Sequence, residues 1–169
     1  MKIELNDFEK EVGMMIAKHR YSMNRKGNVF DARQTDKMTE LEPDIEGAMS
    51  ELAFCKIAKV YPDNVFTLRL SSKSKSTDKG DVKIEGKIFD VKSTKHLSGR
   101  LITRKKNPYV DVYALMVGEE GNYELKGVME SEEFISSKRY GDHFMFTRPC
   151  FMATQRELTP WDDYINATQ

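Results

Sequence analysis

Apolar residues recur at helical spacing along two stretches of the N-terminal third of the chain. Over residues 5–25 they predict an amphipathic helix whose stripe consists of Leu5, Phe8, Val12, Met15, Ile16 and Met23. Asn6 stands where a residue would cap the start of this helix, and Gly27 stands where it would end. A second helix is predicted over residues 44–60, because Pro43 suits a first helical position and the sequence VYPDN interrupts the pattern.

Shorter apolar runs after residue 60 predict strands. The run VDVYALMV at 110–117 is almost wholly apolar, so we expect it to lie inside a sheet. The stretch GDVKIEGKIFDVKST at 80–94 alternates around a glycine-containing turn and predicts a hairpin. Further strands are expected at VFTLRL (65–70), LITR (101–104), YELKGVM (123–129) and, at an edge, FMFT (144–147).

Polar segments and short helices complete the predicted order. The Ser/Lys-rich sequence SSKSKSTDKG at 71–80 predicts a mobile loop. Ser131 is expected to cap a short helix, and Thr159 to cap a terminal helical turn that begins at Pro160 and has acids in its first turn. Two helices, several strands, a helix and one more strand predict a single α/β (α+β) domain over residues 1–169, with a central mixed sheet flanked by helices.

Composition limits the class of protein. Its 169 residues are enough for one domain, and 39% are hydrophobic against 32% charged. Lys and Arg together number 27, as do Asp and Glu, so any basic surface must be local. Cys55 and Cys150 lack metal-ligand spacing and are interpreted as reduced thiols of a cytoplasmic protein. No apolar run approaches the roughly 20 residues that span a bilayer, and MKIELNDFEKE has no apolar core typical of a secretory leader.

The predicted hairpin contains two aspartates that would face each other. If Glu85 and Gly86 form a two-residue turn, Asp81 pairs with Asp90. Side chains that face each other in this way have Cβ atoms about 4.5–5.5 Å apart, so two carboxylates would repel. Either a raised pKa on one carboxyl group or a bound divalent cation would offset the repulsion.

Lys92 joins these acids if the strand is regular. Residues 90 and 92 share a strand face, whereas Val91 points to the opposite one. Lys92 would then lie beside Asp90 and stabilise developing negative charge. The alternative is an exposed hairpin on which Asp90 and Lys92 form a surface ion pair of little energetic value.

Glu51 lies on a helix face that has mainly small or apolar neighbours: Gly47, Ala48, Phe54, Cys55 and Ala58. The polar residues Ser50, Lys56 and Lys59 are expected elsewhere on the helix. A carboxylate on a buried face needs a partner. It either reaches a buried arginine or a backbone N–H, or joins Asp81 and Asp90 in a three-carboxylate site for Mg²⁺ or Mn²⁺.

The segments GAMSELAFCK, GD (80–81) and FDVKST, in this order, resemble the PD-(D/E)XK phosphodiesterase superfamily, particularly its small phage-encoded members. The resemblance covers about residues 8–158, with Gly80 in place of the proline of the motif. It implies the restriction-endonuclease-like fold and metal-dependent hydrolysis of DNA phosphodiesters by an endo- or exodeoxyribonuclease, in the host cytoplasm if the protein is phage-encoded. It also implies that Glu51, Asp81 and Asp90 are metal ligands together with the Val91 carbonyl, and that Lys92 is the catalytic lysine.

Positive charge gathers after the Asp-X-Lys sequence. No acid occurs from Lys92 to Pro108, although the whole chain has no net charge. Basic side chains here would neutralise backbone phosphates, and Tyr109 would either stack on an unpaired base or pack in the core. The residues expected to contact DNA are Arg20, Lys75, Lys95, Arg100, Arg104, Lys105 and Lys106.

Two other functions remain open on the same fold: a non-catalytic nucleic-acid-binding protein and a protein that interacts with a host factor. Other catalytic patterns are missing from the sequence. His19, His96 and His143 have no ligand spacing, and neither a P-loop nor a G-x-G-x-x-G sequence is present. A metal-dependent deoxyribonuclease is therefore the leading hypothesis.

Overall fold

A mixed β-sheet forms the centre of the computed structural model, which describes residues 1–26, 41–62, 80–143 and 148–168. The strand order is β1-β6-β5-β3-β2, and β3 and β5 run parallel while the other neighbours are antiparallel. The strands are β1 (Lys2–Glu4), β2 (Val82–Ile84), β3 (Lys87–Thr94), β5 (Val112–Glu119) and β6 (Asn122–Glu130). The predicted mixed α/β class is confirmed.

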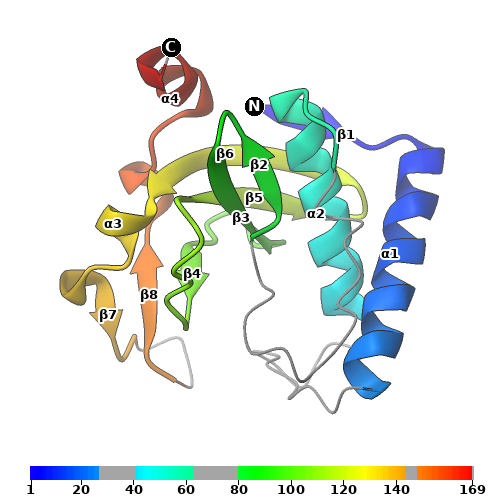
Figure 1. The fold of residues 1–169 in the computed structure, drawn as a ribbon, viewed down its shortest axis with the longest axis horizontal. Coiled ribbons are helices and arrows are strands. Elements are labelled where there is room, and N and C mark those ends of the chain that lie inside the picture. The colour runs from blue at the N-terminus through cyan, green and yellow to red at the C-terminus, as the bar shows by residue number, and fades with distance from the viewer. Residues whose placement is uncertain (27–40, 63–79, 144–147, 169) are drawn as a thin grey trace.

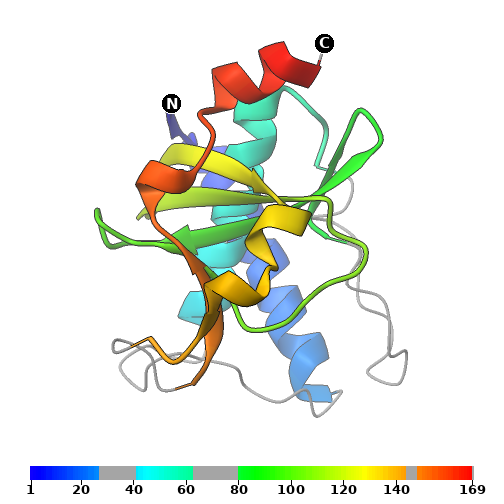
Figure 2. The same ribbon diagram turned by 90° about the vertical axis from the view of Figure 1, so that its left-hand side faces the viewer.

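Helices α1 (Asp7–Lys26) and α2 (Glu42–Ala58) lie on one side of this sheet, as Figures 1 and 2 show together. The other side carries α3 (Ser131–Phe134) and a small antiparallel sheet of order β4-β8-β7. Its strands are β4 (Leu101–Thr103), β7 (Tyr140–Gly141) and β8 (Cys150–Ala153), accompanied by the 3₁₀ turns η1 (Ser137–Arg139) and η2 (Gln155–Glu157). No helix in the described ranges is long and apolar enough to cross a bilayer.

Alternation along β5 divides the apolar residues between two cores. Ala114 and its neighbours at positions 112 and 116 pack with α2, whereas Tyr113 and Leu115 pack with Phe134 on the other face. The same alternation sends Phe89 and Val91 of β3 toward α2. This assignment of faces decides where the polar residues of β3 lie.

The C-terminal helix α4 (Trp161–Thr168) closes the α2-side core. Trp161 and Tyr164 lie 6.1 and 6.0 Å from the ring of Phe89, centroid to centroid. The Tyr164 hydroxyl also donates to the Glu130 carboxylate at 3.1 Å, and Lys87 Nζ binds the same carboxylate at 2.7 Å. Helix α4 thus contacts β3 through Phe89 and Lys87, and β6 through Glu130.

Helix α1 begins as predicted, but only part of its predicted apolar stripe is buried; Ile16 packs against the core. The Asn6 side chain accepts from the Glu9 amide at 2.9 Å, as expected of a cap. Phe8 and Met15, predicted to be on the apolar stripe, are instead 73% and 70% exposed. The helix packs on α2 through the small residues Gly13 and Ala17, because they allow a close approach; a Cβ on Gly13 would lie 2.9 Å from Met49 Cγ.

Two predicted helix caps are wrong. Ser131 is the first residue of α3, and Glu130 precedes it without a side-chain cap. Helix α4 begins at Trp161, one residue later than expected, because the backbones of Thr159 and Val128 exchange two hydrogen bonds of 2.9 Å. The acids Asp162 and Asp163 do occupy its first turn. The strands expected at 65–70 and 144–147, and residues 71–79 of the expected loop, lie outside the described residues.

Candidate functional site

The hairpin has the predicted register. Glu85 and Gly86, with φ angles of 47° and 88°, form the turn, and Val82 pairs with Phe89 while Ile84 pairs with Lys87. Left-handed conformations at both central positions are typical of a tight two-residue hairpin turn.

Asp81 departs from this register, because the paired part of β2 ends at Val82. The Asp81 amide donates to the Phe89 carbonyl at 2.8 Å, and its carboxylate accepts from the Val91 amide at 2.7 Å. Asp81 therefore caps the edge of β3 and does not continue the ladder opposite Asp90. Gly80 makes this turn feasible: its φ is +79°, and a Cβ there would lie 2.3 Å from Ile88 Cγ2.

Asp90 and Lys92 lie on one face of β3, as predicted. Lys92 Nζ is 2.5 Å from Asp90 Oδ1, and Asp90 is only 8% exposed. Val91 points the other way, into the core beneath α2. Strand alternation therefore places Asp90 and Lys92 on the face away from α2.

Glu51 reaches the site from α2 and is 6% exposed. Arg20 of α1 donates two hydrogen bonds to its carboxylate, at 2.8 and 2.6 Å. The open possibility of a buried arginine partner is thus realised, and the partner is a residue that was predicted to contact DNA. Ser50, expected elsewhere on the helix, is fully buried, and its hydroxyl donates to the Gly47 carbonyl at 2.9 Å. A local hydrogen bond to the helix backbone makes this burial possible.

Asp81 interacts electrostatically with Glu51, which comes from α2, and with Asp90, which lies on the other face of β3. The residue Asp81 is partly exposed, but its carboxylate is buried. This burial raises the pKa of Asp81 well above its usual value, and the negative charges of Glu51 and Asp90 raise it further. Lys92 and the Val91 amide act in the opposite direction. Burial lowers the pKa of Arg20, but Glu51 and then Asp81 reverse this and raise it. The charges of Arg20, Glu51, Asp81, Asp90 and Lys92 thus interact as one cluster.

Carboxylate oxygens are the ligands that hard divalent cations prefer, and both Glu51 and Asp90 act on the charge of Asp81. No three His, Cys, Asp or Glu side chains in the described residues are arranged as a ready metal site. Glu51 and Asp90 are instead neutralised by Arg20 and Lys92. In this structure the two outer carboxylates, Glu51 and Asp90, are therefore ion-paired and do not converge with Asp81 on one point.

The residues predicted to contact DNA differ in exposure. Lys95, Lys105 and Lys106 are exposed, and Lys75 lies outside the described residues. Arg100 and Arg104 are half-buried. Arg100 donates to the Met152 sulfur at 3.2 Å, and Arg104 lies near enough to Cys150 to act on its thiol, whose pKa burial raises.

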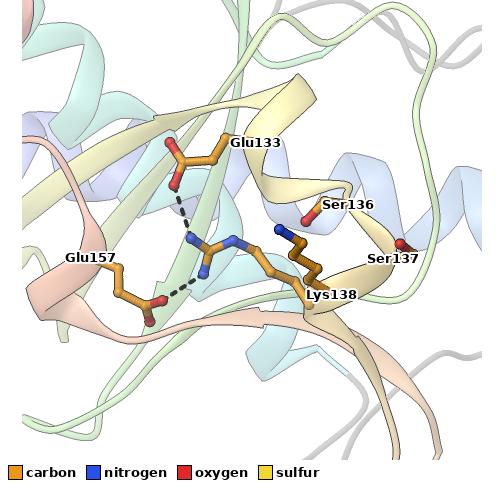
Figure 3. A pocket seen from close by; sticks show the side chains of 6 residues that line it. Glu133, Ser136, Ser137, Lys138 and Glu157 are labelled. Carbon is orange, nitrogen blue, oxygen red and sulfur yellow. Dashed lines mark hydrogen bonds and ion pairs between the residues drawn. The ribbon is translucent and has the colours of Figure 1, made fainter.

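A separate hollow of about 500 Å³, which the sequence reasoning did not identify, lies at α3, η1 and η2 (Figure 3). The Arg139 guanidinium donates to Glu133 at 2.8 Å and to Glu157 at 2.7 Å. The residues that line the hollow are Glu133, Ser136, Ser137, Lys138, Arg139 and Glu157. Because both carboxylates are bound by Arg139, we interpret this feature as a structural clamp.

A family described as "Family of unknown function (DUF5843)" matches residues 3–137. The chain belongs to this family. No curated protein and no solved structure matches the chain. The DUF5843 region contains Glu51, Asp81, Asp90 and Lys92, so the whole charge cluster lies within the part of the chain that defines the family.

Proposed function

We propose that this DUF5843 protein is a divalent-metal-dependent nuclease that hydrolyses phosphodiester bonds of DNA. The observation that carries the proposal is the position of Asp81: its buried carboxylate interacts with those of Glu51 and Asp90, and Lys92 contacts Asp90. Acids whose pKa is strongly raised by burial and by neighbouring charges cluster at functional sites. The order of these residues also agrees with the resemblance to the PD-(D/E)XK superfamily.

Each residue of the cluster has a separate task in this proposal. Glu51, Asp81, Asp90 and the Val91 carbonyl would hold Mg²⁺ or Mn²⁺ once the side chains of Glu51 and Asp90, which approach Asp81 from opposite faces of β3, turn toward one ion. The ion would make a bound water more acidic and polarise a phosphodiester. Lys92 supplies a second positive charge beside Asp90, where negative charge grows on the phosphate. Arg20 holds the Glu51 carboxylate in a fixed direction through its two hydrogen bonds.

The exposed lysines after β3 would position the DNA. Lys95, Lys105 and Lys106 lie in a part of the chain that is free of acids and follows Lys92 directly. Phosphate contacts of this kind fix the nucleic acid in register without reading its sequence.

Cleavage assays test the proposal. Labelled single-stranded, duplex, flap and junction DNA is incubated with purified protein and Mg²⁺ or Mn²⁺, alongside Asp81→Asn, Asp90→Asn and Lys92→Met. Asp162→Asn is a matched control, because this exposed carboxylate lies on α4. We expect cleavage by the wild type and the control, and a loss of at least about 100-fold in the three site variants. Absence of cleavage by the wild type on every substrate, or equal cleavage by Asp90→Asn, would refute the proposal.

One observation favours a second candidate, a nucleic-acid-binding protein without catalysis. Glu51 and Asp90 each have a cationic side chain bound to them at 2.6 and 2.5 Å. In a binding protein these ion pairs would be permanent. Salt-dependent DNA binding without cleavage under any metal condition would support this second function.

A further inference from the structure

Leu97 lies on the loop between β3 and β4 and has the largest exposed fraction, 84%, among the large hydrophobic side chains of the described residues. An isolated exposed leucine is common on protein surfaces. Leu97 differs because of how its backbone is held and which charges surround it.

The loop is tied down by hydrogen bonds at several positions. Gln155 Nε2 donates to the carbonyls of both Leu97 and Gly99, at 2.8 and 2.9 Å. The Gly99 amide donates to the His96 carbonyl at 2.7 Å. Gly99 also packs tightly on Thr94, because a Cβ there would lie 2.2 Å from Thr94 Cγ2. The backbone that presents Leu97 to solvent is therefore constrained before any partner binds.

The chain on both sides of Leu97 is rich in cationic residues. No acid occurs from Lys92 to Val110, and Lys95, Lys105 and Lys106 are exposed. Leu97 is five positions after Lys92, so their Cα atoms lie within about 17–18 Å of each other. A partner complementary to Leu97 and these lysines has a negatively charged exterior and an apolar interior that a single side chain can enter.

Duplex DNA meets both requirements, with its phosphates outside and its base stack inside. We propose that Leu97 is a wedge that inserts between adjacent base pairs of duplex DNA bound beside the cluster, so that the enzyme acts on a kinked duplex. This inference rests on the proposed nuclease function. Single apolar side chains are used as wedges in this way, whereas attachment to an anionic lipid surface uses a broad apolar helix face.

Base unstacking provides a test that does not depend on cleavage. Duplexes that carry 2-aminopurine at successive positions are mixed with the wild type, Leu97→Ala, Leu97→Met and Phe8→Ala in EDTA. Phe8→Ala is the matched control, because it also removes a large exposed apolar side chain, 73% exposed, but from α1. We expect 2-aminopurine emission to rise at one or two adjacent steps with the wild type, Leu97→Met and Phe8→Ala, and this rise to be lost with Leu97→Ala.

DNA affinity and its salt dependence should survive in Leu97→Ala, because the phosphate contacts supply them. Its thermal unfolding should match that of the wild type, because Leu97 contributes little to the core. An equal rise in emission with Leu97→Ala overturns the wedge, as does cleavage of duplex DNA by the wild type without any rise. Both of these results leave the nuclease proposal standing, whereas absence of both cleavage and DNA binding removes the two together. Leu97-dependent binding to phosphatidylserine vesicles without base unstacking would assign the loop to a membrane and overturn the wedge.

Discussion

The Val91 amide donates a 2.7 Å hydrogen bond to the carboxylate of Asp81, a residue that lies beyond the last pair of the hairpin ladder. An amide at the edge of β3 is thereby satisfied by a side chain where a further strand residue would otherwise bind it. The bond holds the Asp81 carboxylate within the field of Glu51 on one side and Asp90 on the other.

Divalent cations should stabilise the folded protein. A cation that binds the folded state raises its free energy of unfolding by mass action, and here it also relieves repulsion among the three acids. We expect Mg²⁺ or Mn²⁺ to raise the melting temperature of the wild type, and Asp81→Asn to reduce this increase. Differential scanning calorimetry at matched ionic strength measures the effect, with Asp162→Asn as control. The same metal response in Asp81→Asn would count against a metal site at this cluster.

Removing Arg20 should destabilise the fold through Glu51. Arg20→Met leaves a carboxylate that is 6% exposed without its two hydrogen bonds. Because the arginine side chain keeps 24% exposure, we expect a loss of about 2 kcal/mol, below the roughly 3–5 kcal/mol lost when a fully buried pair is broken. Urea unfolding of Arg20→Met, and of the double variant Arg20→Met with Glu51→Gln, measures it; the double variant should recover part of the loss.

Lys56→Met serves as the comparison for that experiment. Lys56 pairs with Glu9 at 2.7 Å, but both side chains are about a third exposed, at 37% and 30%. An exposed pair of this kind contributes about 0.5 kcal/mol. Equal losses in Arg20→Met and Lys56→Met would show that burial of Glu51 does not strengthen its dependence on Arg20.

Gly80→Ala should disturb the site through the backbone. Alanine disfavours a φ of +79°, and its Cβ would overlap Ile88, so we expect a loss of about 2 kcal/mol and weaker metal stabilisation. Gly47→Ala is the matched control: this glycine is inside α2 with nothing within 4 Å of an added Cβ. It should be neutral or stabilising by up to about 1 kcal/mol. Chemical denaturation of both variants, with and without Mn²⁺, distinguishes strain at Gly80 from a general effect of glycine replacement.

The contacts of Glu157 with Thr154 and Arg139 should make the free energy of unfolding depend on pH below about 4.5. Hydrogen bonds from the Thr154 backbone and hydroxyl, followed by the bond from Arg139, lower the pKa of Glu157 from its ordinary value of 4.5 to about 2. Because the folded-state pKa is below the unfolded one, the stabilisation is complete above about pH 4.5 and is lost as the pH falls toward 2. Glu157→Gln should therefore lower the free energy of unfolding more at pH 6 than at pH 2.5. Urea unfolding at both pH values checks this, with Glu132→Gln on α3 as control, and an equal loss at both would contradict it.

The local parts of the site followed from sequence, because they depend on short-range geometry. Glu85 and Gly86 specify a two-residue turn, and that turn determines the Val82–Phe89 pairing. Period-two alternation then places Lys92 beside Asp90. Both follow from residues fewer than ten positions apart.

The parts that sequence missed depend on contacts between distant elements. Arg20 and Glu51 are 31 positions apart, and their pairing depends on how closely α1 approaches α2. That approach runs through Gly13, so the face containing Phe8, which periodicity assigned to the core, is left exposed. The break at Asp81 was also missed, because an alternating sequence carries no signal for where a ladder stops.

The aromatic contacts between α4 and Phe89 bear on the limits of the folding unit. The family match ends at residue 137, yet Trp161 and Tyr164 cover the side chain immediately before Asp90 in β3. A fragment cut at the family boundary would expose the ring of Phe89 to water and release β3 from its C-terminal support. The unit that folds is thus larger than the segment that the family model matches, and strand β3, which carries the proposed chemistry, depends on residues from both sides of that boundary.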